Sequence, residues 1–152
     1  MPLPFQKIKY SPKKGVRLEW TEKQDQGSER EVKLRNEDDP SPEFVAALNA
    51  FGRFVREVLG LEGDVWRAEL QVLGVSLTEE DSGTRGIVVT AARRIELTEQ
   101  VVVTAILNTP YVPEERNEDQ IWPGYLRDAV KEIETRAAGY RDGKERAQGE
   151  LF

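Results

Sequence analysis

The chain of 152 residues contains no cysteine and no histidine. Disulfide bonds, thiolate metal sites, cysteine nucleophiles and imidazole bases are therefore excluded from its chemistry. The absence of cysteine agrees with a reducing cytoplasmic location, which we expect for this protein. No stretch reaches the roughly 18 apolar residues of a membrane span, and the first residues lack a basic segment leading into an apolar one. We therefore predict neither a membrane protein nor a secreted one.

The common sequence signatures of enzymes are also absent. The glycines show neither nucleotide-binding nor dinucleotide-binding spacing, and no Gly-x-Ser-x-Gly nucleophile elbow occurs. Two acidic clusters, residues 37–39 and 79–81, carry the oxygen ligands that a hard divalent cation prefers. Both lie in expected turns without an obvious distant partner, so we interpret them as solvated loop acids. We predict a protein that is not an enzyme, with no catalytic residue, no cofactor and no metal.

Charge is unevenly distributed along the chain. The 22 basic and 28 acidic residues give a net charge of −6, which argues against a protein that coats nucleic acid. Residues 1–17 nevertheless carry +5 and no acid, so the other 135 residues carry −11. Their basic side chains, beside the aromatic ring of Tyr10, are candidate nucleic-acid contacts. The five are Lys7, Lys9, Lys13, Lys14 and Arg17. The alternative is a solvated strand face whose lysines guard an edge strand against mispairing.

Polar and apolar residues alternate in three N-terminal segments, residues 8–10, 16–20 and 31–35. This is the period of a half-buried strand. A Ser-Pro-Lys-Lys-Gly turn signal at 11–15 separates the first two segments. The sequence therefore predicts three consecutive strands.

Two further segments have the period of an amphipathic helix. The first begins with Ser41 as N-cap and Pro42 at the first helical position, and Gly60 is placed to end it. The second covers residues 126–140 at a strict 4-3-4-3 spacing. The apolar stripes are Phe44, Leu48, Phe51, Val55 and Val58 or Leu59 in the first helix, and Leu126, Val130, Ile133, Ala137 and Tyr140 in the second.

Between residues 65 and 108 the sequence predicts three more strands. Apolar residues occupy even positions up to Val72 and odd positions from Leu73 onward, so we predict a β-bulge beside Gly74. A hairpin loop at 80–83 leads to a second strand, from Arg85 to about Arg93. Residues 101–108 are nearly all apolar, which predicts a central strand covered on both faces. We expect residues 112–123 to form a polar loop.

The order strand-strand-strand, helix, three strands, helix is typical of the α+β class. We predict one domain over residues 1–142, with an antiparallel sheet of about five to six strands and two amphipathic helices packed on it. Residues 143–152 are predicted to form a flexible C-terminal tail.

The tail ends in Gln148-Gly149-Glu150-Leu151-Phe152, with two large apolar residues where chain ends are usually polar. This Gln-x-x-Leu-Phe pattern resembles the short peptide by which polymerases, repair proteins and many phage proteins dock on the bacterial sliding clamp. The resemblance implies that Leu151 and Phe152 fill an apolar pocket while Gln148 hydrogen-bonds beside it. The family often has an apolar residue in place of Gly149, which implies modest affinity. Alternatively, Leu151 and Phe152 fold back on the domain or form a dimer contact.

The chain is also similar to small proteins of phage and prophage genomes to which no activity is assigned. The similar segments are residues 7–10 with 15–16, residues 108–110, and residues 142–152 including the tail. This resemblance implies a phage context. We therefore expect a non-enzymatic adaptor or modulator that docks on the host sliding clamp during DNA replication. The alternatives are a nucleic-acid-binding module that uses the basic N-terminal hairpin, and a structural or interaction protein.

Overall fold

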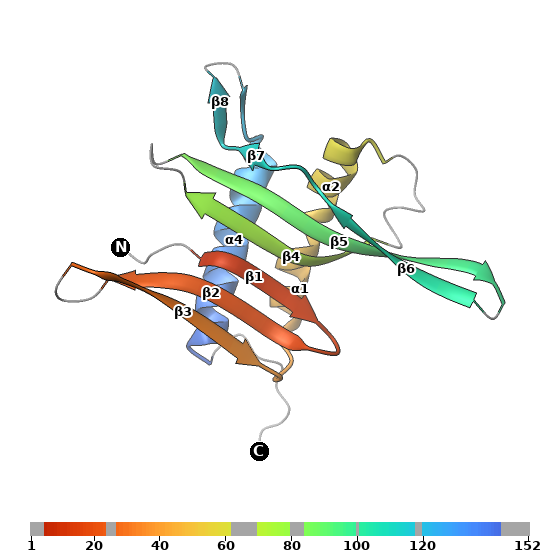
Figure 1. Ribbon diagram of the computed structural model, residues 1–152, viewed down its shortest axis with the longest axis horizontal. Helices are drawn as coiled ribbons and strands as arrows, with labels where there is room; N and C mark the ends of the chain where they lie inside the picture. The colour runs from red at the N-terminus through yellow and green to blue at the C-terminus, as the bar shows by residue number, and fades with distance from the viewer. Residues whose placement is uncertain are drawn as a thin grey trace.

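The computed structural model describes residues 5–23, 27–61, 70–79, 84–99, 101–117 and 120–143. Figure 1 shows two layers, a twisted antiparallel sheet and a layer of helices against one of its faces. The protein is a single α+β domain, as predicted. No helix in the described ranges is long and apolar enough to cross a membrane.

The sheet consists of two antiparallel meanders joined along their first strands. The first meander contains β1 (Phe5–Ser11), β2 (Gly15–Lys23) and β3 (Glu29–Asn36), and the second contains β4 (Leu70–Glu79), β5 (Arg85–Thr98) and β6 (Val101–Asn108). Because β1 pairs with β4, the strand order is β3-β2-β1-β4-β5-β6. A seventh strand, β7 (Val112–Pro113), pairs with β5 beyond the end of β6. A separate two-stranded sheet contains β8 (Glu115–Asn117) and β9 (Gln120–Ile121).

The helices are α1 (Pro42–Asn49), α2 (Gly52–Leu59) and α4 (Gly124–Arg141). The side-chain oxygen of Ser41 accepts a hydrogen bond from the Phe44 amide at 3.1 Å, so the predicted N-cap is confirmed. The predicted helix over residues 41–59 is two consecutive helices instead of one. The Phe51 amide bonds the Leu48 carbonyl, three residues back, which tightens the chain between α1 and α2. Gly60 ends α2 in the left-handed conformation, with φ at 69°.

The core lies between the helices and the face of the sheet that they cover. The predicted stripe of the second helix is confirmed, since its five members are all buried: Leu126, Val130, Ile133, Ala137 and Tyr140. Strand residues of one parity, such as Ile8, Leu18 and Val89, are fully buried beneath the helices. The register of β4 against β5 shifts between Val72 and Gly74, which confirms the predicted β-bulge.

Three expectations for the second half of the chain were wrong. The strand over residues 101–108 is β6, which is the edge of the sheet and not a central strand. Its apolar residues do not mark coverage on both faces, because several of them are exposed to solvent. Among the described residues the sheet has seven strands, somewhat more than the predicted number of about five to six. The segment 112–123 is not a simple polar loop, since it contains β7, β8 and β9 and the buried Trp122.

The last turns of α4 are fixed to the start of α1 through Tyr140. The ring of Tyr140 is fully buried, with its centroid 5.7 Å from that of Phe44. Its hydroxyl donates a hydrogen bond of 2.6 Å to the carbonyl oxygen of Asp38. This contact joins residues about one hundred positions apart and closes one end of the core.

We expect the substitution Tyr140→Phe to lower the free energy of unfolding by about 1–3 kcal/mol, because it leaves a carbonyl oxygen at the core margin without this donor. Urea unfolding measures the change. The matched control is Thr135→Ala, which removes a hydroxyl that donates to a backbone carbonyl on the exposed side of the same helix. We expect this control to change stability by less than about 0.5 kcal/mol. Equal losses in the two variants would contradict the assignment.

Candidate functional site

The face of the sheet opposite the helices is open within the described residues, and it is turned toward the viewer in Figure 1. Strand side chains alternate between the two faces, so the residues next to a buried residue in the sequence point to the open face. On β1, the buried Ile8 lies between Lys7 and Lys9, and on β2, the buried Leu18 lies between Arg17 and Glu19. The charged residues of the N-terminal meander therefore gather on the open face.

Three of these charged residues stand directly opposite one another across three strands. Lys9 of β1 pairs with Arg17 of β2, and Arg17 pairs with Arg35 of β3. We name Lys9, Arg17 and Arg35 the basic row. Like charges that face each other across a sheet destabilise it. No acid forms an ion pair with any of the three within the part of the chain that the structure describes.

The neighbouring row has the opposite arrangement of charge. Lys7 of β1 pairs with Glu19 of β2, and Glu19 pairs with Lys33 of β3. An acid thus separates the two lysines, which is the alternation expected of a surface optimised for stability. The basic row, one step along the same strands, lacks that compensation.

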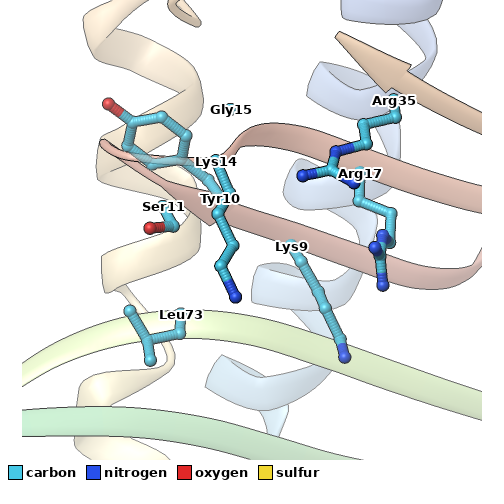
Figure 2. Close-up of a pocket in the computed structure, with 8 residues that line it drawn as sticks. All are labelled: Lys9, Tyr10, Ser11, Lys14, Gly15, Arg17, Arg35 and Leu73. Carbon is cyan, nitrogen blue, oxygen red and sulfur yellow. The ribbon is translucent and has the colours of Figure 1, made fainter. Parts of the chain in front are cut away.

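A shallow hollow of about 190 Å³ lies at the basic row. It is lined by Lys9, Tyr10, Ser11, Lys14, Gly15, Arg17, Arg35 and Leu73, and none of these is acidic. In Figure 2, the side chains of Lys9 and Lys14 run toward β4, which carries Leu73. Arg17 and Arg35 lie together at the right of the view, next to Lys9. The hollow therefore offers four cationic groups beside hydroxyl and apolar groups.

Two glycines allow the chain to build this hollow. Gly15 begins β2 with φ at 80°, and a Cβ atom at this position would overlap the carbonyl oxygen of Asn36. The turn that carries Lys14 therefore requires glycine at this point. Gly74 of β4 pairs with Lys9, and a Cβ atom at Gly74 would come within 2.7 Å of the Lys9 Cγ. The side chain of Lys9 thus packs directly against the backbone of Gly74.

The phenol of Tyr10 remains protonated at neutral pH. Burial raises its pKa above the ordinary value of 10.0, and the negative charge of Asp39 raises the pKa further. The ring packs partly against the core. Tyr10 can therefore contribute a hydroxyl donor at the wall of the hollow, while most of its ring serves packing.

The structure brings together three of the five predicted basic residues, Lys9, Lys14 and Arg17. Lys7 belongs to the neighbouring row, and Lys13 is exposed in the turn without lining the hollow. The expectation that these lysines guard an edge does not hold, because β1 and β2 each have a strand on both sides. Sequence reasoning missed Arg35. Only the register of β3 on β2 reveals its place beside Arg17.

The predicted clamp-docking residues Gln148, Leu151 and Phe152 lie outside the described residues. Of the acidic clusters, residues 37–39 are described and residues 80–81 are not. Within the described ranges, no group of three or more acidic side chains is arranged to hold a metal ion.

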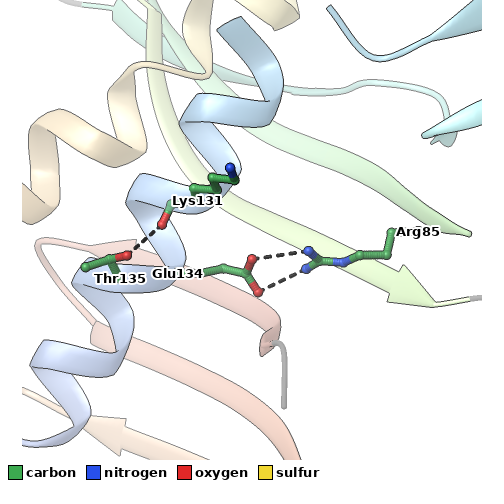
Figure 3. A network of polar contacts seen from close by, with 4 residues as sticks. All are labelled: Arg85, Lys131, Glu134 and Thr135. Carbon is green, nitrogen blue, oxygen red and sulfur yellow. Dashed lines mark hydrogen bonds and ion pairs between the residues drawn. The ribbon is translucent and has the colours of Figure 1, made fainter. Parts of the chain in front are cut away.

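A second hollow, of about 400 Å³, lies between β5 and the first turns of α4. Its charged lining residues balance, three basic against three acidic: Arg85, Arg127 and Lys131, and Glu114, Asp128 and Glu134. Figure 3 shows the two guanidinium nitrogens of Arg85 bonded to the two carboxylate oxygens of Glu134, at 3.2 and 3.0 Å. Both side chains are largely shielded from solvent. This pair is suited to fastening α4 to the sheet, since its charges are already satisfied.

Comparison with known proteins finds no family model that matches the chain, and no curated protein or solved structure that is significantly similar to it.

The basic row has a measurable consequence for stability. We expect Arg17→Thr to raise the free energy of unfolding by about 0.5 kcal/mol, because it removes a charge flanked by Lys9 and Arg35. The matched substitution Glu19→Thr, flanked by Lys7 and Lys33, should lower it by a similar amount. Urea unfolding at low and high salt checks both, and each difference should shrink as salt screens the charges. A loss of stability in Arg17→Thr would show that the row is already compensated.

Proposed function

We propose that this protein binds the phosphate backbone of nucleic acid through the open face of its N-terminal meander. The observation that supports this proposal is the basic row, in which three cations are held in direct register and no described acid forms an ion pair with them. Such an arrangement costs stability in the free protein. An anionic partner removes that cost when it binds, and releases its own counterions in doing so.

The extent of the basic row favours a polyanion over a single small anion. Strands in a sheet lie about 4.8 Å apart, so the outer members of the row are separated by roughly 10 Å at the backbone. That span exceeds one phosphate group and suits several phosphates along one strand of a nucleic acid. Leu73 and the edge of Tyr10 add apolar surface beside the cations, as in proteins that bind single strands.

The net charge of −6 restricts this binding to the local face, because the rest of the molecule repels phosphate. We infer weak, salt-sensitive contact and no extended coating of nucleic acid. A weak contact of this kind becomes effective when a second contact holds the protein near its target.

We propose that the C-terminal tail provides this second contact by docking on the bacterial sliding clamp. The support is the Gln-x-x-Leu-Phe pattern of Gln148, Leu151 and Phe152. The apolar stripe of α4 ends just before the tail begins. The last buried residue of the stripe is Tyr140, and Gly143 follows with φ at 86°. The protein would then be a non-enzymatic adaptor of phage or prophage type, with its body delivered to DNA at the clamp.

For the nucleic-acid contact, we expect the triple variant Lys9→Ala, Arg17→Ala, Arg35→Ala to bind a labelled single-stranded oligonucleotide at least tenfold more weakly than the parent. Fluorescence anisotropy across a range of salt concentrations measures both affinity and its salt slope. Losing three phosphate contacts should reduce that slope by about 2.

The control for this experiment is the double variant Lys7→Ala, Lys33→Ala, which removes cations from the compensated row of the same strands. We expect it to weaken binding less than threefold. If the parent does not bind at low salt, or if both variants lose affinity equally, the basic row is not a nucleic-acid site.

For the clamp contact, we expect titration calorimetry of the full chain with a bacterial sliding clamp to give a micromolar or tighter dissociation constant, about −8 kcal/mol. A chain ending at Ala147, and the variant Phe152→Ala, should both abolish the heat of binding. Glu150 occupies one of the two variable positions of the pattern, so the control variant Glu150→Ala should bind within about twofold of the parent. Binding that survives truncation would place the contact on the domain instead.

A further inference from the structure

The edge of the sheet formed by β6 carries no charged residue along its whole length. Four of its large apolar side chains are exposed: Val101 by 45%, Val102 by 44%, Val103 by 43% and Ile106 by 54%. Within the described ranges, β6 pairs with β5 on one side, and no strand pairs with its other side. A long, apolar, unpaired edge is a template for another strand.

The opposite edge of the same sheet is built differently. Five of the eight residues of β3 are charged: Glu29, Arg30, Glu31, Lys33 and Arg35. Charged side chains are a common protection against pairing of sheet edges. The molecule therefore protects one edge and leaves the other suited to pairing.

The hydrogen bonds show which backbone groups of β6 face outward. The amide of Thr109, just beyond the strand, donates to the Val89 carbonyl of β5 at 3.0 Å. In an antiparallel pair, the residues alternate between bonding inward and pointing outward. The register has no shift on the β6 side, so Leu107, Ala105 and Val103 bond toward β5. The amides and carbonyls of Val102, Thr104 and Ile106 therefore point away from the sheet.

The sequence of β6 is self-complementary about Thr104. In an antiparallel pair of two identical strands centred on this residue, Val102 lies opposite Ile106 of the second copy, and Thr104 lies opposite itself. All three are residues whose backbone groups point outward, so each meets a partner that can exchange hydrogen bonds with it. The other pairs are Val103 with Ala105 and Val101 with Leu107. No pair brings charge against charge or charge against an apolar side chain.

We propose that β6 is a homodimer interface, in which two copies of the protein join their sheets edge to edge about a two-fold axis at Thr104. The second copy is the occupant that the edge fits, because the same strand supplies both a complementary hydrogen-bond ladder and an apolar partner for each of the four exposed apolar side chains. The helices of both copies would lie on the same side of one continuous sheet. One strand pair is a small interface, so association in the micromolar range is expected.

Sedimentation equilibrium of the full chain tests the proposal. We expect a concentration-dependent monomer–dimer equilibrium for the parent. The variant Thr104→Lys should raise the dissociation constant at least tenfold, because the axis places two like charges directly opposite each other. The matched control, Thr78→Lys, introduces the same charge at an exposed position of β4, away from the edge, and should dimerise like the parent. Circular dichroism and urea unfolding establish that both variants fold.

A mixing experiment tests the register itself. Thr104→Lys and Thr104→Glu should each be monomeric alone, whereas an equimolar mixture should form a heterodimer, since residue 104 faces residue 104. A parent that stays monomeric at high concentration overturns the proposal. So does a Thr104→Lys variant that dimerises as tightly as the parent. A dimer that is lost when the chain ends at Ala147, but is kept in Thr104→Lys, assigns the contact to the tail and also overturns it.

Discussion

The structure depends on burial of the sheet from one side only. All described helices pack on the same face, so strand residues such as Ile8, Leu18 and Val89 enter the core, whereas neighbours such as Lys9 and Arg17 point to the other face. The pairing of β1 with β4 holds this arrangement together, because it joins two meanders that are separated in the chain by α1 and α2. The contact of Tyr140 with the chain at Asp38 closes the same layer at the end of α4.

Features that follow from local periodicity could be predicted from the sequence. The stripe of α4 is visible at a 4-3-4-3 spacing because a helix repeats every 3.6 residues. The bulge beside Gly74 is visible because one extra residue exchanges the two faces of a strand. The N-cap at Ser41 depends only on its own neighbours in the chain.

Features that depend on strand neighbours could not be predicted in this way. The apolar composition of β6 is the same whether the strand is covered or exposed, so the sequence alone predicts a central strand where the structure has an edge strand. The basic row could not be predicted for the same reason, because it too depends on which strands are neighbours. The excess of cations before residue 18 is visible in the sequence, but the place of Arg35 depends on the pairing of β3 with β2. That pairing is a matter of register between distant residues.

The contrast between the two edges of the sheet bears on how far assembly can proceed. A sheet in which both edges can pair with another strand can grow without limit, as fibrils do, because each added copy exposes a new unpaired edge. This sheet has one apolar edge, β6, and one charged edge, β3. Joining two β6 edges consumes both templates and leaves only β3 at each outer boundary. The charge on β3 thus prevents further copies from adding to the sheet, so assembly stops at the dimer.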